Sequence, residues 1–243
     1  MQRDSIDFSS SDVGKLFRRF LFPTVMGMVF SAVFVITDGI FVGRGIGSDA
    51  LASVNIVAPL FTLGTGLGLM FGMGGSVVAS INLAQGKRRV AEINITQSRV
   101  LPALLIALLS ALLIHCHKPL LMLLGTPGEL MVPAREYLVW FTLFLAPLAV
   151  FNILMFIVRL DGAPGFAMAC NIMAACINIA LDYLFIFVFE WGLAGAAVAT
   201  GIGYVVGSGV MLWYMFRRSR TLRFVKPPSR GSRRRDPERD LWG

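Results

Sequence analysis

The sequence has 243 residues, of which 56% are hydrophobic and only 15% are charged, and its mean hydropathy is +0.73. A soluble domain needs roughly 25% charged residues to cover its surface, so this composition excludes an ordinary soluble protein and indicates a protein of the lipid bilayer. The net charge of +8 is no sign of nucleic-acid binding, because the basic residues cluster between and after apolar segments, as membrane topology requires.

Six apolar segments, each long enough to cross a hydrocarbon core of about 30 Å, follow one another along the chain. Because a segment in lipid must satisfy its own backbone hydrogen bonds, each is expected to be an α-helix. The predicted spans are 17–43, 52–84, 100–123, 134–158, 166–189 and 193–216. We therefore predict an all-α, polytopic membrane protein. It has an N-terminal segment over 1–16, a six-helix transmembrane bundle over 17–216, and a basic, disordered tail over 217–243.

The basic residues also predict how the chain crosses the membrane. If the N-terminus lies in the cytoplasm, 19 of the 22 lysines and arginines fall on the cytoplasmic side, and only Arg44, Lys118 and Arg135 fall outside. Cytoplasmic loops are enriched in basic residues, so both termini are predicted to be cytoplasmic, in a bacterial plasma (inner) membrane. No cleavable signal pattern precedes the first span, which is expected to remain in the mature protein.

Small residues and prolines predict where helices pack and bend. Two rows of small residues recur every four positions, Gly64, Gly68 and Gly72 in the second span and Ala199, Gly203 and Gly207 in the sixth. Such rows allow close helix packing, whereas a phosphate-binding loop would need a Lys-Ser/Thr pair that does not follow. Pro147 and Asn152 predict a kink in the fourth span, and Pro23 is a potential bend in the first.

Two of the fourteen acidic residues lie well inside the apolar spans, Asp38 in the first and Asp182 in the fifth. A charged side chain at the bilayer centre costs roughly 2.5–3.5 kcal/mol, so these acids indicate a functional site. Both spans run outward and both acids lie in the outer half, so the two carboxyls can converge on one cavity. The alternative is that each aspartate caps or hydrogen-bonds a neighbouring helix.

Other polar residues share the helix faces of these two acids. The fifth span carries Asn171 and Asn178 before Asp182, the first carries Thr24 and Ser31 before Asp38, and Thr200 lies in the outer half of the sixth. Carboxylate, amide and hydroxyl oxygens suit a proton or a hard cation such as Na⁺, and they do not suit zinc or copper. For Asn171 and Thr200 taken alone, helix packing is an equally good interpretation.

Nothing in the spans indicates a cofactor or an enzyme. The three cysteines, Cys116, Cys170 and Cys176, occur in apolar stretches at spacings that imply neither a disulfide framework nor a metal site. The spans hold no nucleophile–base pair and no metal cluster, so an integral-membrane enzyme is the least supported class of function.

Three stretches of the chain resemble one family of membrane transporters. They are ITDGIFVGRGIGSDALASVNIVAPL together with the preceding Pro23, then FIVRLDGAPGFAM, and then NIMAACINIALDYLFIF followed by GLAGAAVATGIG. In this order they are similar to the first two helices, the loop between the fourth and fifth helices, and the fifth and sixth helices of MATE (multidrug and toxic compound extrusion) transporters. The resemblance covers about residues 12–226.

The resemblance implies roles for particular residues. Asp38, Asn178 and Asp182 match the cation-binding residues of the prokaryotic, DinF-like branch. Tyr137, Asn152 and Thr200 would belong to the same network, and Pro23 matches the proline at which the first helix bends. MATE transporters have twelve helices in two lobes, so the resemblance implies that this six-helix bundle corresponds to the amino-terminal lobe only.

The same resemblance implies a cation-coupled antiporter that exports organic cations or amphiphilic drugs in exchange for H⁺ or Na⁺. We expect a truncated, half-length form without a cofactor, whose partners are the lipid bilayer, a small-molecule substrate and a second six-helix lobe from another copy or chain. Two alternatives stay open. One is a flippase for lipid-linked oligosaccharides from the same superfamily, and the other is a non-transporting membrane subunit or gene remnant.

Overall fold

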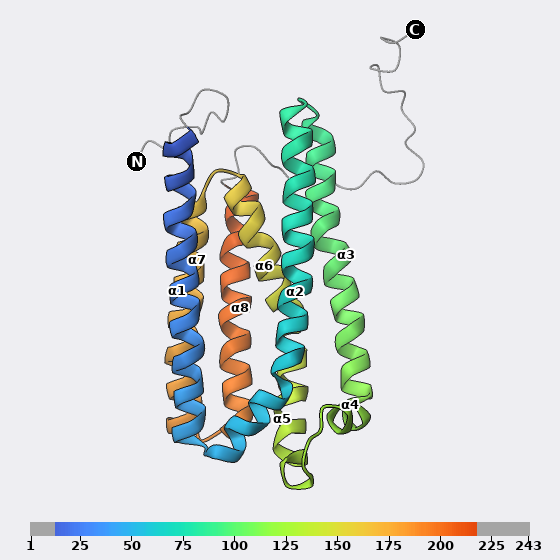
Figure 1. The fold of residues 1–243 in the computed structure, drawn as a ribbon, viewed down its shortest axis with the longest axis vertical. Helices are drawn as coiled ribbons and strands as arrows, with labels where there is room; N and C mark the ends of the chain where they lie inside the picture. Colours follow the sequence, from blue (N-terminus) through green and yellow to red (C-terminus); the bar gives the residue numbers. More distant parts are fainter. Residues whose placement is uncertain (1–12, 218–243) are drawn as a thin grey trace.

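The computed structural model describes residues 13–217 (Figure 1). The N-terminal residues 1–12 and the tail over 218–243 lie outside the described residues, so the disorder predicted for the tail stays a prediction. The elements in chain order are α1 (Val13–Gly45), α2 (Ser48–Ala84), α3 (Arg88–His115), α4 (His117–Leu123), the 3₁₀ turn η1 (Gly128–Leu130), α5 (Met131–Leu143), α6 (Leu145–Leu160), α7 (Pro164–Asp182), the π-helical η2 (Tyr183–Val188) and α8 (Gly192–Arg217).

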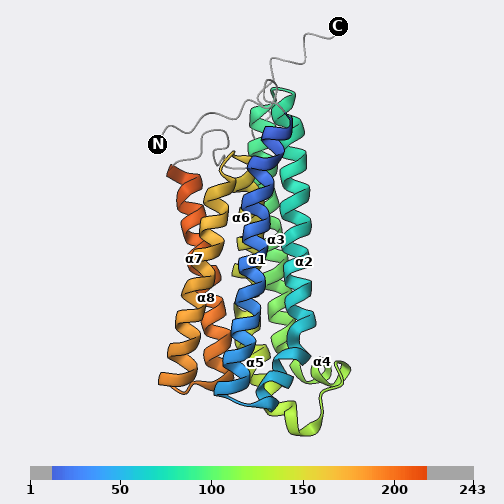
Figure 2. The same cartoon turned by 60° about the vertical axis from the view of Figure 1, so that its left-hand side comes forward.

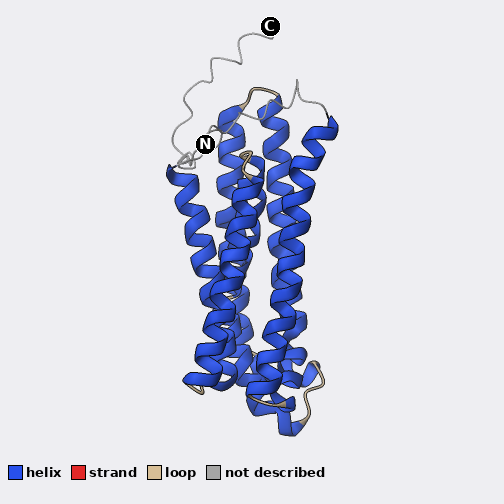
Figure 3. Cartoon of the chain, turned by 90° about the vertical axis from the view of Figure 1, so that its left-hand side faces the viewer, coloured by secondary structure: helices blue, strands red, loops and turns tan. Residues whose placement is uncertain are grey.

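The predicted all-α membrane fold is confirmed. Residues 13–217 contain helices and connecting loops without any strand (Figure 3). Within this range five helices are long and apolar enough to cross a membrane, and there are six such spans if the bent pair of α5 and α6 is counted as one. The third predicted span, 100–123, is wrong at its end, because α3 stops at His115 and the separate short helix α4 follows Cys116.

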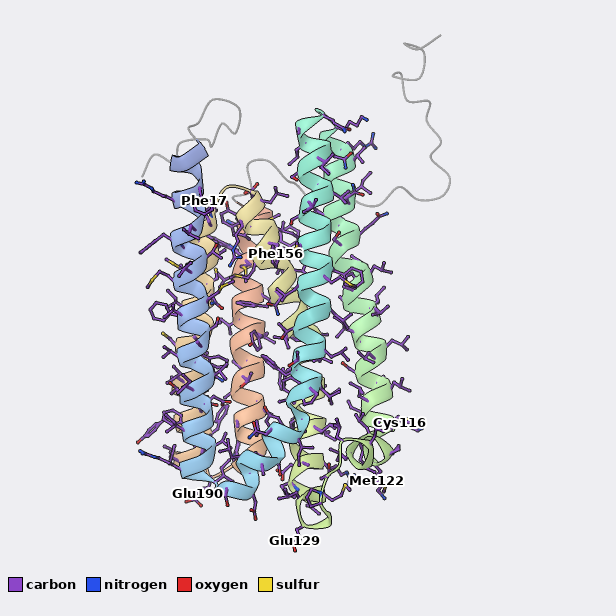
Figure 4. The ribbon with its side chains drawn as sticks, viewed as in Figure 1. Phe17, Cys116, Met122, Glu129, Phe156 and Glu190 are labelled. Carbon is purple, nitrogen blue, oxygen red and sulfur yellow. The ribbon has the colours of Figure 1, made fainter. Side chains whose placement is uncertain are left out.

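The helices form one elongated bundle whose chain reverses at two ends. The α1–α2 turn, α4 with η1, and the α7–α8 turn all lie at the end far from residue 13, which we call the distal end (Figures 1 and 2). Glu129 and Glu190 mark this end, and Phe17 lies near the other (Figure 4). Helices α1 and α7 both run toward the distal end, and they pack against each other.

The fourth span is bent at Phe144, where α5 and α6 meet at 47°. Pro147 lies in the first turn of α6, where its missing N–H breaks no hydrogen bond within that helix. The predicted kink therefore exists, although it lies three residues before Pro147. Gly201 of α8 faces the Phe144 ring so closely that a Cβ there would overlap the ring. The break between α5 and α6 therefore packs directly against α8.

The glycine rows bring helices into close contact, as predicted. A Cβ at Gly68 would lie 2.9 Å from Asn152 Cβ and 3.1 Å from the Ala149 backbone, and one at Gly72 would lie 3.0 Å from Ile153 Cα. The second-span row therefore faces α6, against which α2 packs most extensively. On α8, a Cβ at Gly203 would lie 2.9 Å from the Ala174 carbonyl oxygen, so that row brings α8 against α7.

The packing of α1 on α7 brings the two predicted polar faces together. Asn171 donates through Nδ2 to the Gly27 carbonyl oxygen at 2.9 Å and to Ser31 Oγ at 3.0 Å. Gly27 and Asn171 are 144 positions apart, and so are Asp38 and Asp182 (182 − 38). Eleven residues separate the two pairs on each helix and make just over three helical turns. Two parallel helices that are in register at Gly27 and Asn171 are therefore also in register at Asp38 and Asp182. This register aligns the two buried acids.

Candidate functional site

The two intramembrane aspartates lie together near the distal end of the bundle. The side chains of Asp38 on α1 and Asp182 on α7 are within hydrogen-bonding reach of each other. Asp182 is completely buried, and Asp38 is partly buried with its Oδ1 atom sealed from solvent. Two carboxylates can hydrogen-bond to each other only if one of them carries a proton, so the pair can hold a shared proton between α1 and α7.

Asn178 and Thr200 connect this pair to α8. Asn178 lies one turn before Asp182 on α7 and interacts with its carboxyl. Its amide Nδ2 donates to Thr200 Oγ1 at 3.0 Å. Asn178 is 2% exposed and Thr200 is 8% exposed, so this bond between helices is shielded from solvent. It leaves the amide oxygen Oδ1 of Asn178 as a buried atom without a donor.

Four oxygen atoms of this cluster are buried acceptors without a hydrogen-bond donor among the described residues. They are Asp38 Oδ1, Asp182 Oδ1, Asp182 Oδ2 and Asn178 Oδ1. We call them the acceptor cluster. A buried acceptor without a partner costs about 1–3 kcal/mol, and more when it is charged. A proton or a metal cation is the kind of ligand that relieves this cost, because it supplies positive charge to several oxygens at once.

Tyr137 on α5 closes the cluster from another side. It is 8% exposed and lies within electrostatic reach of both Asp38 and Asp182. Its ring stacks on Phe141 at a centroid distance of 5.8 Å, which fixes its position. Four helices, α1, α5, α7 and α8, therefore contribute polar side chains to one place.

A cavity of about 200 Å³ adjoins the cluster. Asn178, which contributes one oxygen to the acceptor cluster, and its partner Thr200 both line this cavity. The cavity lining includes four aromatic rings, Phe34, Phe61, Phe151 and Tyr204, and no Lys or Arg from the described part of the chain. Its walls come from α1, α2, α6, α7 and α8, so it lies inside the bundle.

The remaining predicted site residues lie apart from the two carboxyls. Asn152 lines the cavity, and its Nδ2 donates to the Leu148 carbonyl oxygen of its own helix at 3.0 Å. Pro23 lies within α1, which is assigned as one unbroken helix from Val13 to Gly45. The structure thus brings together Asp38, Asp182, Asn178, Thr200 and Tyr137, and it places Asn152 on the cavity wall.

The sequence analysis missed two features of this region. One is Tyr204, which lines the cavity and lies within electrostatic reach of Asp38. Its spacing of four residues after Thr200 puts it on the same face of α8, and that signal was available. The other is the π-helical turn η2, which begins directly after Asp182. Such turns are frequent at functional sites, but no residue pattern in this chain predicts one.

Comparison with known proteins gives the chain its family. The family described as MatE matches residues 23–184. The multidrug export protein MepA of Staphylococcus saprophyticus is 30% identical over 229 residues, which cover 90% of this chain and 50% of the relative. MepA of Staphylococcus aureus (strain MSSA476) is 27% identical over 217 residues, which cover 87% and 47%. The chain spans about half the length of the curated relatives it matches.

Solved structures agree with this match. The outward-facing structure of a multidrug resistance MATE family transporter of the MOP superfamily is 25% identical, with a TM-score of 0.85 over 95% of this chain and 52% of that one. A MATE structure in the bent conformation is 26% identical, with a TM-score of 0.82 over 90% and 50%. The fold is that of one half of a MATE transporter, and the chain belongs to the MatE family.

Proposed function

We propose that this chain is the cation-coupling half of a multidrug exporter. It binds H⁺ or Na⁺ between Asp38, Asn178 and Asp182, beside Thr200, and uses that cation to drive the export of organic cations or amphiphilic drugs. The observation that carries the proposal is the acceptor cluster, four buried oxygens without a donor in the described structure. The relatives whose names describe them as multidrug export proteins support the direction of transport.

The chemistry of the cluster suits either cation. A proton can be shared between the two carboxyls, and Na⁺ can be held by carboxylate, amide and hydroxyl oxygens, which are hard ligands. In both cases the bound cation offsets negative charge buried between α1 and α7. When the cation leaves, the two carboxylates repel each other across that contact. Cation exchange therefore changes how firmly α1 is held against α7.

Pro23, Tyr137 and Asn152 have supporting roles in this proposal. Pro23 removes one backbone hydrogen bond from α1, so this helix can bend there when its contact with α7 loosens. Tyr137 lies within electrostatic reach of both carboxyls and adds a phenol hydroxyl to the surroundings of the cation. Asn152 presents a polar amide to the cavity. Together they would connect the cation to the shape of the cavity.

The composition of the cavity wall favours a cationic substrate. Its aromatic rings can interact with an organic cation through their faces, and the wall contributes no basic side chain within residues 13–217. A flippase for lipid-linked sugars would need basic residues at the cavity to hold the phosphates. Arg159, which lies at the end of α6 with its guanidinium 5.7 Å from the centre of the Phe156 ring, does not line the cavity.

Transport needs a second six-helix lobe in this account. Alternating access moves one repeat against another around a central site, and this chain spans about half of its relatives. We propose that another copy or another chain supplies the second lobe, in a bacterial plasma membrane with both termini cytoplasmic.

The test is transport in vesicles. The purified chain is reconstituted in liposomes, and movement of ethidium, an organic cation, is followed while a Na⁺ or H⁺ gradient is imposed. We expect ion-driven ethidium transport that Asp38→Asn abolishes. Ethidium transport that is indifferent to both gradients and to Asp38→Asn would reject ion coupling. An inactive chain that gains activity when a second lobe is co-reconstituted would support the two-lobe requirement.

A further inference from the structure

The cavity inside the bundle is small for a drug-sized molecule. Its volume is about 200 Å³, whereas pockets that enclose a whole drug measure roughly 300–1,000 Å³. An apolar protein cavity of about 150 Å³ holds one benzene ring. The cavity therefore accommodates one aromatic ring with a short substituent, and a larger drug would place only such a part of itself there.

Three phenylalanines supply much of the apolar wall. Phe34 lies on α1, Phe61 on α2 and Phe151 on α6, and each of them lines the cavity. The face of an aromatic ring attracts a cation, and edge-to-face or offset contacts between rings are favourable. The wall thus suits a ligand that is both aromatic and positively charged.

Thr65 on α2 brings a hydroxyl without a partner to this cavity. Thr37 and Thr62 each donate to the carbonyl oxygen four residues earlier in their own helix. Thr65 makes no such bond. It lines the cavity, and its Oγ1 is buried without a hydrogen-bond partner in the described structure. Because a buried hydroxyl without a partner is costly, a polar group of a ligand stabilises this position.

Asn152 on α6 adds an amide oxygen to the same part of the wall. Its Nδ2 donates to the Leu148 carbonyl oxygen at 3.0 Å, while its Oδ1 accepts from no described residue and is not sealed from solvent. Thr65 precedes Gly68 by about one helical turn, and a Cβ at Gly68 would lie 2.9 Å from Asn152 Cβ. Neighbouring turns of α2 and α6 therefore carry two oxygens that can each accept a hydrogen bond.

We propose that this cavity is a subsite for a protonated arylalkylamine, one aromatic ring with an ammonium group that carries an N–H, and that Thr65 and Asn152 select for that N–H. This rests on the proposed function, because it takes the cavity to be the substrate site. The ring lies among the phenylalanines, and the ammonium donates to Thr65 Oγ1 and Asn152 Oδ1. A quaternary ammonium keeps the charge but leaves both oxygens without a donor.

A methylation series separates loss of the donor from growth of the ligand. Binding of benzylammonium and of its N-methyl, N,N-dimethyl and N,N,N-trimethyl derivatives is measured at neutral pH with the full chain in nanodiscs, and empty nanodiscs give the background. Each methyl group adds similar volume, but only the last one removes the final N–H. We expect the affinity to fall most at this last step, by about tenfold or more, as for a hydrogen bond to a charged group. A smooth decline along the series overturns the proposal.

Thr65→Val tests the residue itself, because it removes the hydroxyl and keeps a branched side chain. We expect it to weaken binding of the N–H-bearing ligands by about tenfold and to leave binding of the trimethyl compound unchanged. Thr65→Ser keeps a hydroxyl and should bind like wild type. Equal weakening for every ligand in Thr65→Val would show a packing defect and overturn the selective role of Thr65.

Thr62→Val is the matched control on the same helix. Thr62 is exposed, and its hydroxyl donates to the Ala58 carbonyl oxygen at 3.2 Å. This variant should bind the whole series like wild type. The wild-type series needs no variant, so it decides the requirement for a donor even where Thr65→Val fails to fold.

Cation binding by the same preparations separates this proposal from the proposed function. Binding of ²²Na⁺ or H⁺ without any binding of benzylammonium overturns the subsite alone. Selective binding of benzylammonium by a chain that binds neither Na⁺ nor H⁺ supports the subsite and overturns ion coupling. A chain that binds neither benzylammonium nor a coupling cation overturns both.

Discussion

The amide nitrogen of Asn178 donates to Thr200 Oγ1 at 3.0 Å, and this one bond decides which end of the amide lacks a partner. With Nδ2 bonded to α8, Oδ1 is left as a buried acceptor without a donor in the described structure. A neutral side chain thus adds an oxygen to a site that otherwise consists of carboxylates. Thr200 acts on the cation site through Asn178, by orienting its amide.

Replacing Thr200 tests this orientation. In Thr200→Val the shape is kept but Asn178 Nδ2 loses its acceptor, so the amide is free to turn and its oxygen is no longer fixed. We expect the affinity for the coupling cation to fall by about tenfold, as for the loss of one hydrogen bond of roughly 1 kcal/mol or more. Thr200→Ser keeps the hydroxyl and should bind like wild type. Equal affinities for the valine and serine variants would show that the amide is oriented by something else.

The contact between α1 and α7 gives a second prediction. Asn171 is its polar anchor, bonded to both the Gly27 carbonyl oxygen and Ser31 Oγ. Interhelical hydrogen bonds in membrane proteins are worth roughly 0.6 kcal/mol each on average, so Asn171→Ala should lower the free energy of unfolding by about 1 kcal/mol. Ser31→Ala removes only one of the two bonds and should cost about half as much. Thermal unfolding in detergent compares the variants, and a larger loss for Ser31→Ala would contradict this assignment.

The glycine row on α2 gives a matched pair of substitutions. A Cβ at Gly68 would press on the Ala149 backbone at 3.1 Å, whereas one at Gly66 would have no neighbour within 4 Å. Overpacking against backbone costs typically about 1–3 kcal/mol, so Gly68→Ala should lower the melting temperature of the purified chain. Gly66→Ala gains helix propensity of about 1 kcal/mol and should leave it unchanged or higher. The idea fails if Gly66→Ala is the more damaging of the two.

Cysteine labelling can test the proposed orientation of the chain in the membrane. Glu129 and Glu190 lie at the distal end (Figure 4), and Gln85 follows the last residue of α2 in the α2–α3 connection, which lies at the other end (Figure 1). After the three native cysteines are replaced, single cysteines at these positions are exposed to an impermeant maleimide in intact cells. Glu129→Cys and Glu190→Cys should be labelled, while Gln85→Cys should react only after lysis. Reversed labelling would refute the cytoplasmic placement of the termini.

The sequence predicted the fold well because lipid allows so few structures. Apolar length alone located six spans, since a segment in the bilayer must form a helix. The ends of the spans were less accurate. The break between α3 and α4 at Cys116 lies in the polar run His115 to Lys118 that Pro119 follows, so the sequence did contain a signal that the predicted span 100–123 ignored. The bend at Phe144 depends on the fit of that ring against Gly201, a tertiary contact that local sequence does not encode.

The sequence identified the site residues that are costly to bury in lipid and those that share a helix face with such a residue. Asp38 and Asp182 were identifiable because acids in lipid are expensive, and Asn178 because it precedes Asp182 by one turn. Tyr204 was overlooked because a tyrosine in an apolar span is ordinary, and only the structure shows that it lines the cavity beside Asn178 and Thr200. Which polar atoms lack a hydrogen-bond donor also depends on side-chain orientation, and the spacing of residues in the sequence does not reveal that orientation.

Cation binding by the purified chain is the measurement that tests the central claim most directly. Equilibrium binding of ²²Na⁺, and proton uptake after a pH jump, are measured for wild type, Asp38→Asn and Asp182→Asn, with Asp49→Asn as a control at the exposed start of α2. The account predicts one saturable cation site in wild type and Asp49→Asn, and its loss in both intramembrane variants while they remain folded and inserted. Wild-type cation binding in either Asp38→Asn or Asp182→Asn would contradict a site shared by the two carboxyls.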